Sequence, residues 1–251
     1  MPSIDDTLFL SLLFFAVATI YSTVGHAGAS GYLAAMALLG LAPEVMRPTA
    51  LTLNIVVAAF TAYRFRRARF FSWSGLWPFL LGSVPFAALG GAQKLSPGGY
   101  YAAVGVVLLV SALYLTWRAI NVAQLPADGE VNVRKLPAVF IGAVIGLLSG
   151  LTGTGGGIFL SPTILFLGWA GPKSTAGISA PFILVNSITA LVAGAGMVDS
   201  LPINLPIFAA CAIGGALLGT WLGLERLRQR YLLITLAVVM AIAAFKLLLI
   251  A

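Results

Sequence analysis

The sequence predicts an all-α, polytopic membrane protein made of two inverted-topology repeats, and three observations lead to this fold class. Of the 251 residues, 60% are hydrophobic and only 8% are charged, whereas soluble domains carry about a quarter charged residues. The charges are clustered and leave uncharged runs of the length that a bilayer span needs. Two of these runs have the same length and are interrupted by glycines, which indicates an internal repeat.

The uncharged runs account for the predicted spans. A transmembrane β-barrel would show alternating segments of ~10 residues, and these runs are continuously apolar. In chain order they cover residues 7–43, 48–63, 70–93, 95–117, 136–172, 174–198, 200–224 and 231–245.

Little of the chain remains for anything but spans. The longest charged connection, residues 118–135, is too short for a soluble catalytic or nucleic-acid module. The net charge of +7 therefore indicates topology, not nucleic-acid binding. A single cysteine, Cys211, excludes an internal disulfide and a cysteine metal cluster. We expect no metal, no cofactor and no enzymatic activity.

The repeat is set by runs 7–43 and 136–172. Each has 37 residues, and they are offset by 129 positions. Each is broken by glycines, at Thr-Val-Gly-His-Ala-Gly-Ala in the first run and at Leu-Thr-Gly-Thr-Gly-Gly-Gly in the second. Each is followed by three further runs. The sequence thus predicts a first transmembrane repeat at 1–118, a cytoplasmic linker at 119–135 and a second repeat at 136–251.

A 37-residue run is too long for one span. As a straight helix it would measure ~55 Å at ~1.5 Å per residue, against a hydrocarbon core ~30 Å thick. The glycine break leaves ~15 residues on either side, and glycine allows the chain to reverse. We expect two short helices meeting at a turn inside the membrane, the second starting near Ala29 and near Gly157.

Loop charges orient the repeats. Positive loops face the cytoplasm, so the chain must cross the membrane an even number of times between the two arginine loops. Five runs lie between these loops. The number of crossings is even only if run 136–172 is a hairpin that returns to its own side. The loops at equivalent positions carry only Asp199 and only Lys94, which indicates opposite orientation of the two halves. The termini then face outward, and Lys173 faces the cytoplasm. The two arginine loops hold Arg64, Arg66, Arg67 and Arg69, and Arg226, Arg228 and Arg230.

The two turns form the predicted substrate site. Helix N-termini favour anions, and inverted-repeat transporters bind substrate at the midplane between broken helices. Hydroxyl, amide and backbone donors surround the turns, and no carboxylate lies in the middle of any run. The alternative is that the hydroxyls bond their own backbone and the glycines only allow close packing. The candidate residues are Thr23, Gly25, Gly28, Ser30, Asn54, Thr152, Gly153, Thr154, Gly155, Gly156, Gly157 and Asn186, with Ser22 and Ser161 nearby.

His26 is the only histidine and lies in the first turn. An ionisable group at membrane depth suggests a function, and histidine titrates near neutral pH. We expect His26 to contact substrate or to couple a proton; a neutral structural histidine is the alternative. Two glycine stripes, Gly142/Gly146/Gly150 and Gly215/Gly219/Gly223, predict close helix packing.

Two basic residues stand near helix starts and could steer anions from a vestibule. Arg47 precedes Pro48 in the first half, and Lys173 precedes run 174–198 in the second. Exposed interfacial anchoring is the alternative for both.

Other motifs lead to weaker hypotheses. Gly28-Ala29-Ser30-Gly31 resembles the serine motif of rhomboid intramembrane proteases, but no histidine follows His26 to serve as the base. The second turn lacks the Gly-Lys-Ser/Thr of a phosphate loop. Thr23-Val24-Gly25-His26 resembles a potassium filter, but the acid-free surroundings and the dissimilar second turn argue against one.

The doubled glycine turn, above all Gly153-Thr154-Gly155-Gly156-Gly157 followed by Ser161-Pro162, resembles the sulfite exporter TauE/SafE family, the four-toluene-sulfonate uptake permeases. The resemblance covers nearly the whole chain. It implies secondary transport of sulfite, organosulfonates or related sulfur anions across a bacterial inner membrane. The first turn departs from the family pattern, so we expect His26 and Ser30 to set selectivity.

The resulting hypothesis is a secondary transporter that moves a small sulfur oxyanion, sulfite above all, by alternating access. Export is the expected direction, and the expected partners are the small anion and membrane lipid, with a homodimer allowed by the glycine stripes. The alternatives are an importer of organosulfonates or other organic anions, or an intramembrane serine hydrolase. The tryptophans lie near span ends, as in an interfacial belt, and so indicate no aromatic ligand pocket.

Overall fold

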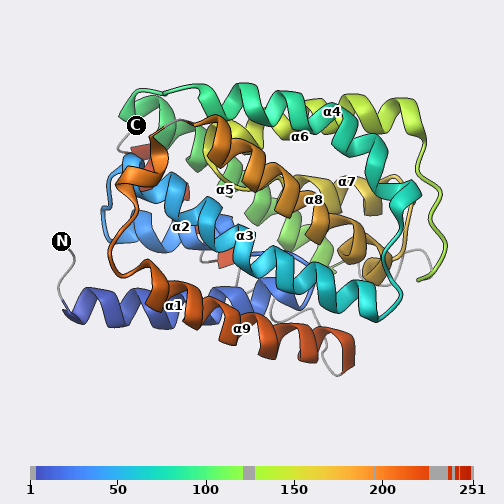
Figure 1. Ribbon diagram of the computed structural model, residues 1–251, viewed down its shortest axis with the longest axis horizontal. Coiled ribbons are helices and arrows are strands. Elements are labelled where there is room, and N and C mark those ends of the chain that lie inside the picture. Colours follow the sequence, from blue (N-terminus) through green and yellow to red (C-terminus); the bar gives the residue numbers. More distant parts are fainter. Residues whose placement is uncertain are drawn as a thin grey trace.

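The computed structural model describes residues 4–120, 128–194, 196–225, 237–238, 241–242 and 244–249. Within these ranges the chain is helical apart from turns and one isolated bridge between Val131 and Ala170. The main helices (Figure 1) are α1 (Ile4–Ser22), α2 (Ala29–Leu38), α3 (Pro43–Arg67), α4 (Trp73–Ala92), α5 (Pro97–Ile120), α6 (Lys135–Thr152), α7 (Gly157–Phe166), α8 (Pro172–Ala193), the 3-10 turn η2 (Met197–Ser200) and α9 (Leu205–Glu225).

Six helices within the described residues are long and apolar enough to cross a membrane. They are α3, α4, α5, α6, α8 and α9. Large apolar side chains stand exposed on them, among them Leu136 at 71% and Val192 at 77%, as a surface facing lipid requires. The all-α, multi-pass membrane fold class is therefore confirmed.

Both 37-residue runs form the predicted hairpins. α1 ends at Ser22 and α2 begins at Ala29, whereas α6 ends at Thr152 and α7 begins at Gly157. Gly28 and Gly156, directly before the second helices, have φ values of 104° and 78°, which glycine adopts without the clash of a Cβ. The predicted starts of the second helices are confirmed.

The two arms of each hairpin are unequal, which corrects the expected even division. The first arms have 19 and 18 residues and the second arms 10 each. Gly40 and Gly168, with φ of 70° and 64°, end the second arms early in left-handed turns that satisfy the last carbonyls. At ~1.5 Å per residue, the second arms reach only about halfway through a bilayer core.

Each hairpin begins and ends at the same end of the molecule (Figure 1). Asn204 donates to the Thr7 hydroxyl near the start of α1 at 2.9 Å, and nearby Ser200 shares a cavity wall with Pro43, the first residue of α3. In the second half the Asn132 N–H donates to the Trp169 carbonyl at 2.8 Å. The start of α6 thus lies beside the end of α7.

The helices that follow the hairpins, α3 and α8, run in opposite directions (Figure 1). Gly177 near the start of α8 packs against the Phe70 backbone just beyond the end of α3. α3 begins at Pro43, not at Pro48 as the charge pattern suggested. Glu44 and Arg47, which interrupt the uncharged sequence, lie within the first turns of the helix. α8 likewise begins at Pro172, which places Lys173 inside it.

The two glycine stripes join the halves. Gly142, Gly146 and Gly150 on α6 lie against α4, and Gly215, Gly219 and Gly223 on α9 lie against α1. A Cβ at any of the six would overlap a carbonyl oxygen of the partner helix or, at Gly223, that of Thr23 directly after it, so the packing prediction is confirmed. Residue numbers rise together across both interfaces, so each pair of helices runs parallel.

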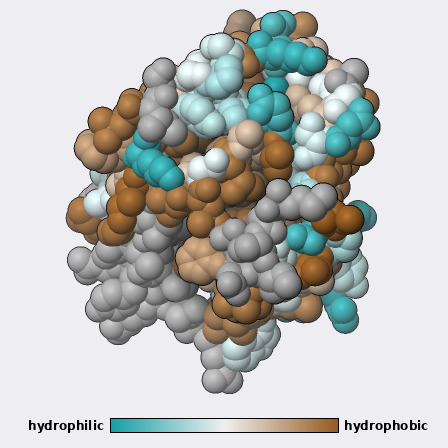
Figure 2. Space-filling view, turned by 90° about the vertical axis from the view of Figure 1, so that its left-hand side faces the viewer, coloured by the Kyte–Doolittle hydropathy of each residue, from teal (hydrophilic) through white to brown (hydrophobic). Residues whose placement is uncertain are grey.

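Some predictions fall outside the described residues. The arginine loop at 226–230, the linker segment 121–127 and most of run 231–245 belong to this group. Figure 2 views the end of the molecule at which α1 and α3 begin, where hydrophilic side chains gather among apolar surface.

Candidate functional site

The two glycine turns meet at a small cavity lined by buried residues. Its volume is about 10 Å³, room for at most about one water molecule. No carboxylate lines it. The wall consists of Tyr21, His26, Ala27, Gly28, Ala29, Ser30, Asn54, Thr154, Ile158 and Ile183.

Asn54 of α3 links both turns to each other. Its Oδ1 accepts from the Ala29 N–H at the start of α2, at 3.1 Å. Its Nδ2 donates to the Thr154 carbonyl in the second turn and to the Ser187 hydroxyl of α8, both at 3.3 Å. Asn54 is fully buried, so one amide satisfies a helix N-terminus and holds the opposite turn.

His26 reaches from the first turn to the second hairpin. Its Nε2 is hydrogen-bonded to the Ser161 hydroxyl of α7 at 2.6 Å, and Ser161 is bonded to the Ser179 hydroxyl of α8 at 2.8 Å. The ring is 3% exposed. The chain from His26 through Ser161 to Ser179 therefore connects three elements behind the cavity.

Ser30 has a different partner from the one that a serine hydrolase needs. Its hydroxyl is hydrogen-bonded to the Tyr21 phenol at 2.6 Å, and His26 is bonded to Ser161 instead. Each of the two side chains is thus bonded to another hydroxyl, whereas hydrolysis requires the serine and the base to face each other.

Thr23 and Thr152 direct their hydroxyls to their own helices. Thr23 donates to the Ile20 carbonyl at 2.6 Å and Thr152 to the Leu148 carbonyl at 2.7 Å. Thr152 also lies 3.0 Å from the hydroxyl of Thr154. Of these three candidates, only Thr154 lines the cavity.

The candidate glycines let neighbouring helices and side chains pack directly onto the turn backbone. A Cβ at Gly25 would overlap Ala176, one at Gly155 would meet Asn54, and one at Gly157 would meet Ile183. Gly153 packs against Arg47, and Gly156 against Ile145 and Phe182. Gly28 is the candidate glycine that also lines the cavity. The turns thus remain bare backbone because side chains would separate the packed helices.

Asn186 does not line the cavity, although it is as buried as Asn54. Its Nδ2 donates to the Phe182 carbonyl at 2.9 Å, and its Oδ1 has no partner among the described residues. Ile183, which stands 129 positions after Asn54, lines the cavity instead. The two halves therefore present different side chains, an amide and an isoleucine, to the same space.

Arg47 lies in a vestibule, and both terminal nitrogens of its guanidinium are already engaged, whereas its Nε has no hydrogen-bond partner among the described residues. The vestibule has a volume of about 420 Å³ and is lined by Arg47, Glu44, Lys94, Tyr100 and Ser200 with neighbouring apolar residues. Arg47 donates to the carbonyls of Gln93, Gly90 and Gly91 at 2.9, 2.7 and 3.0 Å, and to that of Gly150. It thereby joins the C-terminal ends of α4 and α6.

Lys173 lies at the opposite end of the molecule. Its ammonium is 5.4 Å from the Phe70 ring centroid and donates to the Leu224 carbonyl at 3.5 Å. Ala176, not Lys173, packs against the first turn in the way that Arg47 packs against the second. Arg47 and Lys173 are therefore not structural counterparts.

The sequence reasoning missed Tyr21, Ser179, Ser187 and Tyr100. Tyrosine prefers the membrane–water interface, so a tyrosine in the middle of run 7–43 was a usable signal for Tyr21. The serines of α8 carried no such signal, because their partners lie on other helices.

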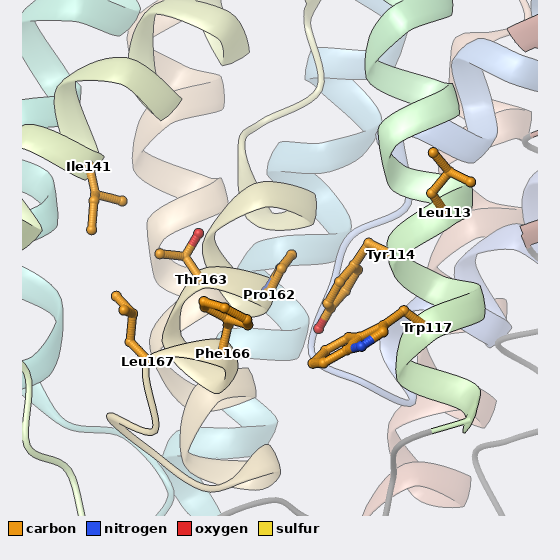
Figure 3. Close-up of a pocket in the computed structure, with 8 residues that line it drawn as sticks. All are labelled: Leu113, Tyr114, Trp117, Ile141, Pro162, Thr163, Phe166 and Leu167. Carbon is orange, nitrogen blue, oxygen red and sulfur yellow. The ribbon is translucent and has the colours of Figure 1, made fainter.

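A larger apolar groove on the flank is separate from this site. Figure 3 shows Tyr114 and Trp117 of α5 facing Pro162 and Phe166 of α7 across it. Its volume is about 630 Å³, and its lining is almost entirely apolar. It offers no set of donors for an anion.

Comparison with known proteins identifies the family. The family described as Sulfite exporter TauE/SafE matches residues 10–247. The chain is 37% identical over 247 residues to "Probable membrane transporter protein y4hK" of Sinorhizobium fredii (strain NBRC 101917 / NGR234), across 97% of this chain and 98% of that protein. No solved structure matches. The chain therefore belongs to the TauE/SafE sulfite exporter family and is a multi-pass membrane transporter, not an enzyme.

Proposed function

We propose that the protein is a secondary transporter that exports a small sulfur oxyanion, with sulfite as its main substrate, across the bacterial inner membrane. The substrate site is the central cavity between the two glycine turns. The observation that carries this proposal is the convergence of two helix N-termini on a buried, carboxylate-free space lined by hydroxyl, phenol, imidazole and amide groups. Such a set replaces the water shell of an oxyanion with fixed donors.

The small volume of the cavity supports alternating access. About 10 Å³ does not accommodate sulfite, which is larger than the single water that such a space admits. The turns must separate before the anion enters. A closed centre below a vestibule of about 420 Å³ corresponds to an occluded state of a transporter.

The helix directions support two inverted repeats. α3 and α8 are antiparallel, and each hairpin returns to its own end of the molecule. The parallel pairs α1–α9 and α4–α6 each combine one helix from either half. Two inverted repeats that pack together produce such pairs, in which a helix of one half lies beside a helix of the other. Inverted repeats are the architecture of many secondary transporters.

The charge distribution supports the orientation and the choice of an anion. Arg64, Arg66 and Arg67 lie at the end of α3 that is remote from the vestibule. Positive loops face the cytoplasm, so the vestibule faces outward. A basic inner face raises the local concentration of an anion to be exported.

The test is sulfite flux in liposomes that contain the purified protein. We expect saturable efflux of radiolabelled sulfite, reduced by excess unlabelled sulfite and less by sulfate. Competition by taurine and sulfoacetate separates a sulfite exporter from an organosulfonate carrier, because a carrier of the larger anions would be blocked by them at lower concentration. Absence of flux for every sulfur anion would refute the substrate assignment.

A further inference from the structure

The vestibule and the central cavity lie along the same helix. Arg47 of α3 lines the vestibule, and Asn54 of α3 lines the cavity. They are seven positions apart along the helix, about 10 Å at ~1.5 Å per residue. A segment packed against α3 between Arg47 and Asn54 closes the shortest path between the vestibule and the cavity.

The second glycine turn fills the interval. At the outer end, a Cβ on Gly153 would lie 3.0 Å from the Arg47 Cγ. At the inner end, the Thr154 carbonyl accepts from Asn54, and Thr154 lines the cavity. The turn therefore runs beside α3 from the vestibule to the cavity.

Two buried side chains from the vestibule wall hold this turn in place. The Tyr100 phenol of α5 donates to the Thr152 carbonyl at 3.0 Å. Arg47 donates to the Gly150 carbonyl in the last turn of α6 and, with the same guanidinium, to three carbonyls at the end of α4. Tyr100 is 3% exposed and Arg47 is 6% exposed, so both side chains are largely shielded from water.

The first turn is held differently. Gly25 packs directly against Ala176 of α8 without a long polar side chain between them. Its Ala27 carbonyl accepts from Tyr32 at 2.8 Å, a bond within the same hairpin. Side chains from α3 and α5 in the vestibule wall thus hold carbonyls of the second turn and of the end of α6. The first turn is held by its own His26 ring, which is bonded to Ser161, and by Asn54 at Ala29, and neither contact involves a vestibule residue.

We propose that Arg47 and Tyr100 are positioning residues for transport: they close the path from the vestibule to the central cavity by holding the second glycine turn against α3. This inference rests on the proposed function, since it assumes that the cavity exchanges with the vestibule. Releasing the Thr152 and Gly150 carbonyls frees the end of α6 and the turn that follows. The path to the cavity then opens without a change in the first turn.

The test measures access to the cavity and needs no substrate. Ile183→Cys in a Cys211→Ala background puts one thiol in the cavity wall. The probe is 2-sulfonatoethyl methanethiosulfonate, a membrane-impermeant anion, applied to liposomes from outside. Ser200→Cys in the same background lines the vestibule. Its labelling gives the fraction of protein molecules whose vestibule faces the outside of the liposome.

We expect slow labelling of Ile183→Cys alone and about five- to tenfold faster labelling when Tyr100→Phe is added, the population change that follows from losing one hydrogen bond. Arg47→Lys, which keeps the charge but loses the forked geometry, should accelerate labelling at least as much. Tyr100→Phe decides the outcome if Arg47→Lys fails to fold, which size-exclusion chromatography reports.

Tyr32→Phe is the matched control, because it removes a bond of the same kind from the first turn. It should leave labelling from the vestibule side unchanged. The proposal is wrong if Tyr100→Phe labels no faster than the parent, or if Tyr32→Phe accelerates labelling equally. If the wild-type protein carries no sulfite but the labelling rates change as described, the proposed function fails and the closure by Arg47 and Tyr100 stands.

Discussion

At the scale of residues, the polar side chains of the core connect the two halves of the chain. Asn54 bonds to Thr154, and His26 bonds to Ser161, each across 100 or more residues of sequence. An unpaired buried polar group is costly, so these bonds hold the hairpins together while the cavity is closed. They must also be broken or exchanged when an anion enters.

His26→Gln tests whether the imidazole titrates during transport. Glutamine can still bond to Ser161 but does not change charge, so we expect the pH dependence of sulfite flux to flatten between about pH 5.5 and 7.5, where histidine titrates. The measurement is the flux in liposomes across that range. Ser161→Ala is the control, since it removes the partner but keeps the ring; an unchanged rate and pH profile in His26→Gln would exclude a titrating role.

Asn54→Leu tests the amide that links the turns. The substitution leaves the Ala29 N–H without its acceptor and releases the second turn, so we expect sulfite flux to fall by about tenfold or more. Asn186→Leu is the matched control: Asn186 is equally buried but does not line the cavity. Flux is compared per folded protein, and an equal loss in both variants would contradict the assignment of Asn54 to the site.

At the scale of elements, glycine has two distinct roles in this chain. In the turns, left-handed backbone at Gly28 and Gly156 starts the second helix of each hairpin. In the stripes, helical glycines at positions such as Gly146 and Gly215 let two helices approach until a carbonyl fills the space of the missing Cβ. The first role is local, and the second depends on which helix lies opposite.

Gly215→Ala tests the contact between α9 and α1. Its Cβ would overlap the Phe15 carbonyl oxygen, so the helices must move apart, and we expect a loss of about 1–3 kcal/mol in unfolding free energy. Gly214→Ala is the control, because its Cβ would meet only Phe15 ring carbons, at 3.5 and 3.6 Å. Thermal unfolding in detergent measures both; equal melting temperatures would show that the stripe is not a close contact.

At the scale of the whole molecule, each hairpin starts and finishes at the same end of the molecule, and the turns of both hairpins meet at the central cavity. The vestibule opens at one end, and the arginine-rich end of α3 lies at the other. Both α4 and α6 end at Arg47. Movement of the second hairpin, which contains α6, therefore transmits directly to the vestibule wall.

The proposed orientation is tested with single cysteines at the two ends of α4. Ser96 follows α4 at the vestibule end, Ser74 lies in its first turn, and both are exposed. In a Cys211→Ala background we expect a membrane-impermeant thiol reagent to label Ser96→Cys in intact spheroplasts, and Ser74→Cys only after permeabilisation. The reverse pattern would invert the topology and place the vestibule in the cytoplasm.

The sequence by itself determined the fold class, the two hairpins and the residues at which their second helices begin. These features depend on local physics: apolar length must match a bilayer, and glycine alone adopts the left-handed turn without strain. Only the tertiary structure decided that His26 pairs with Ser161, that Arg47 caps two helix ends, that Tyr100 holds the second turn and that Ile183 takes the place expected for Asn186. Such pairings depend on the rotation and register of helices far apart in sequence, which are set by side-chain packing between them and which no local pattern encodes.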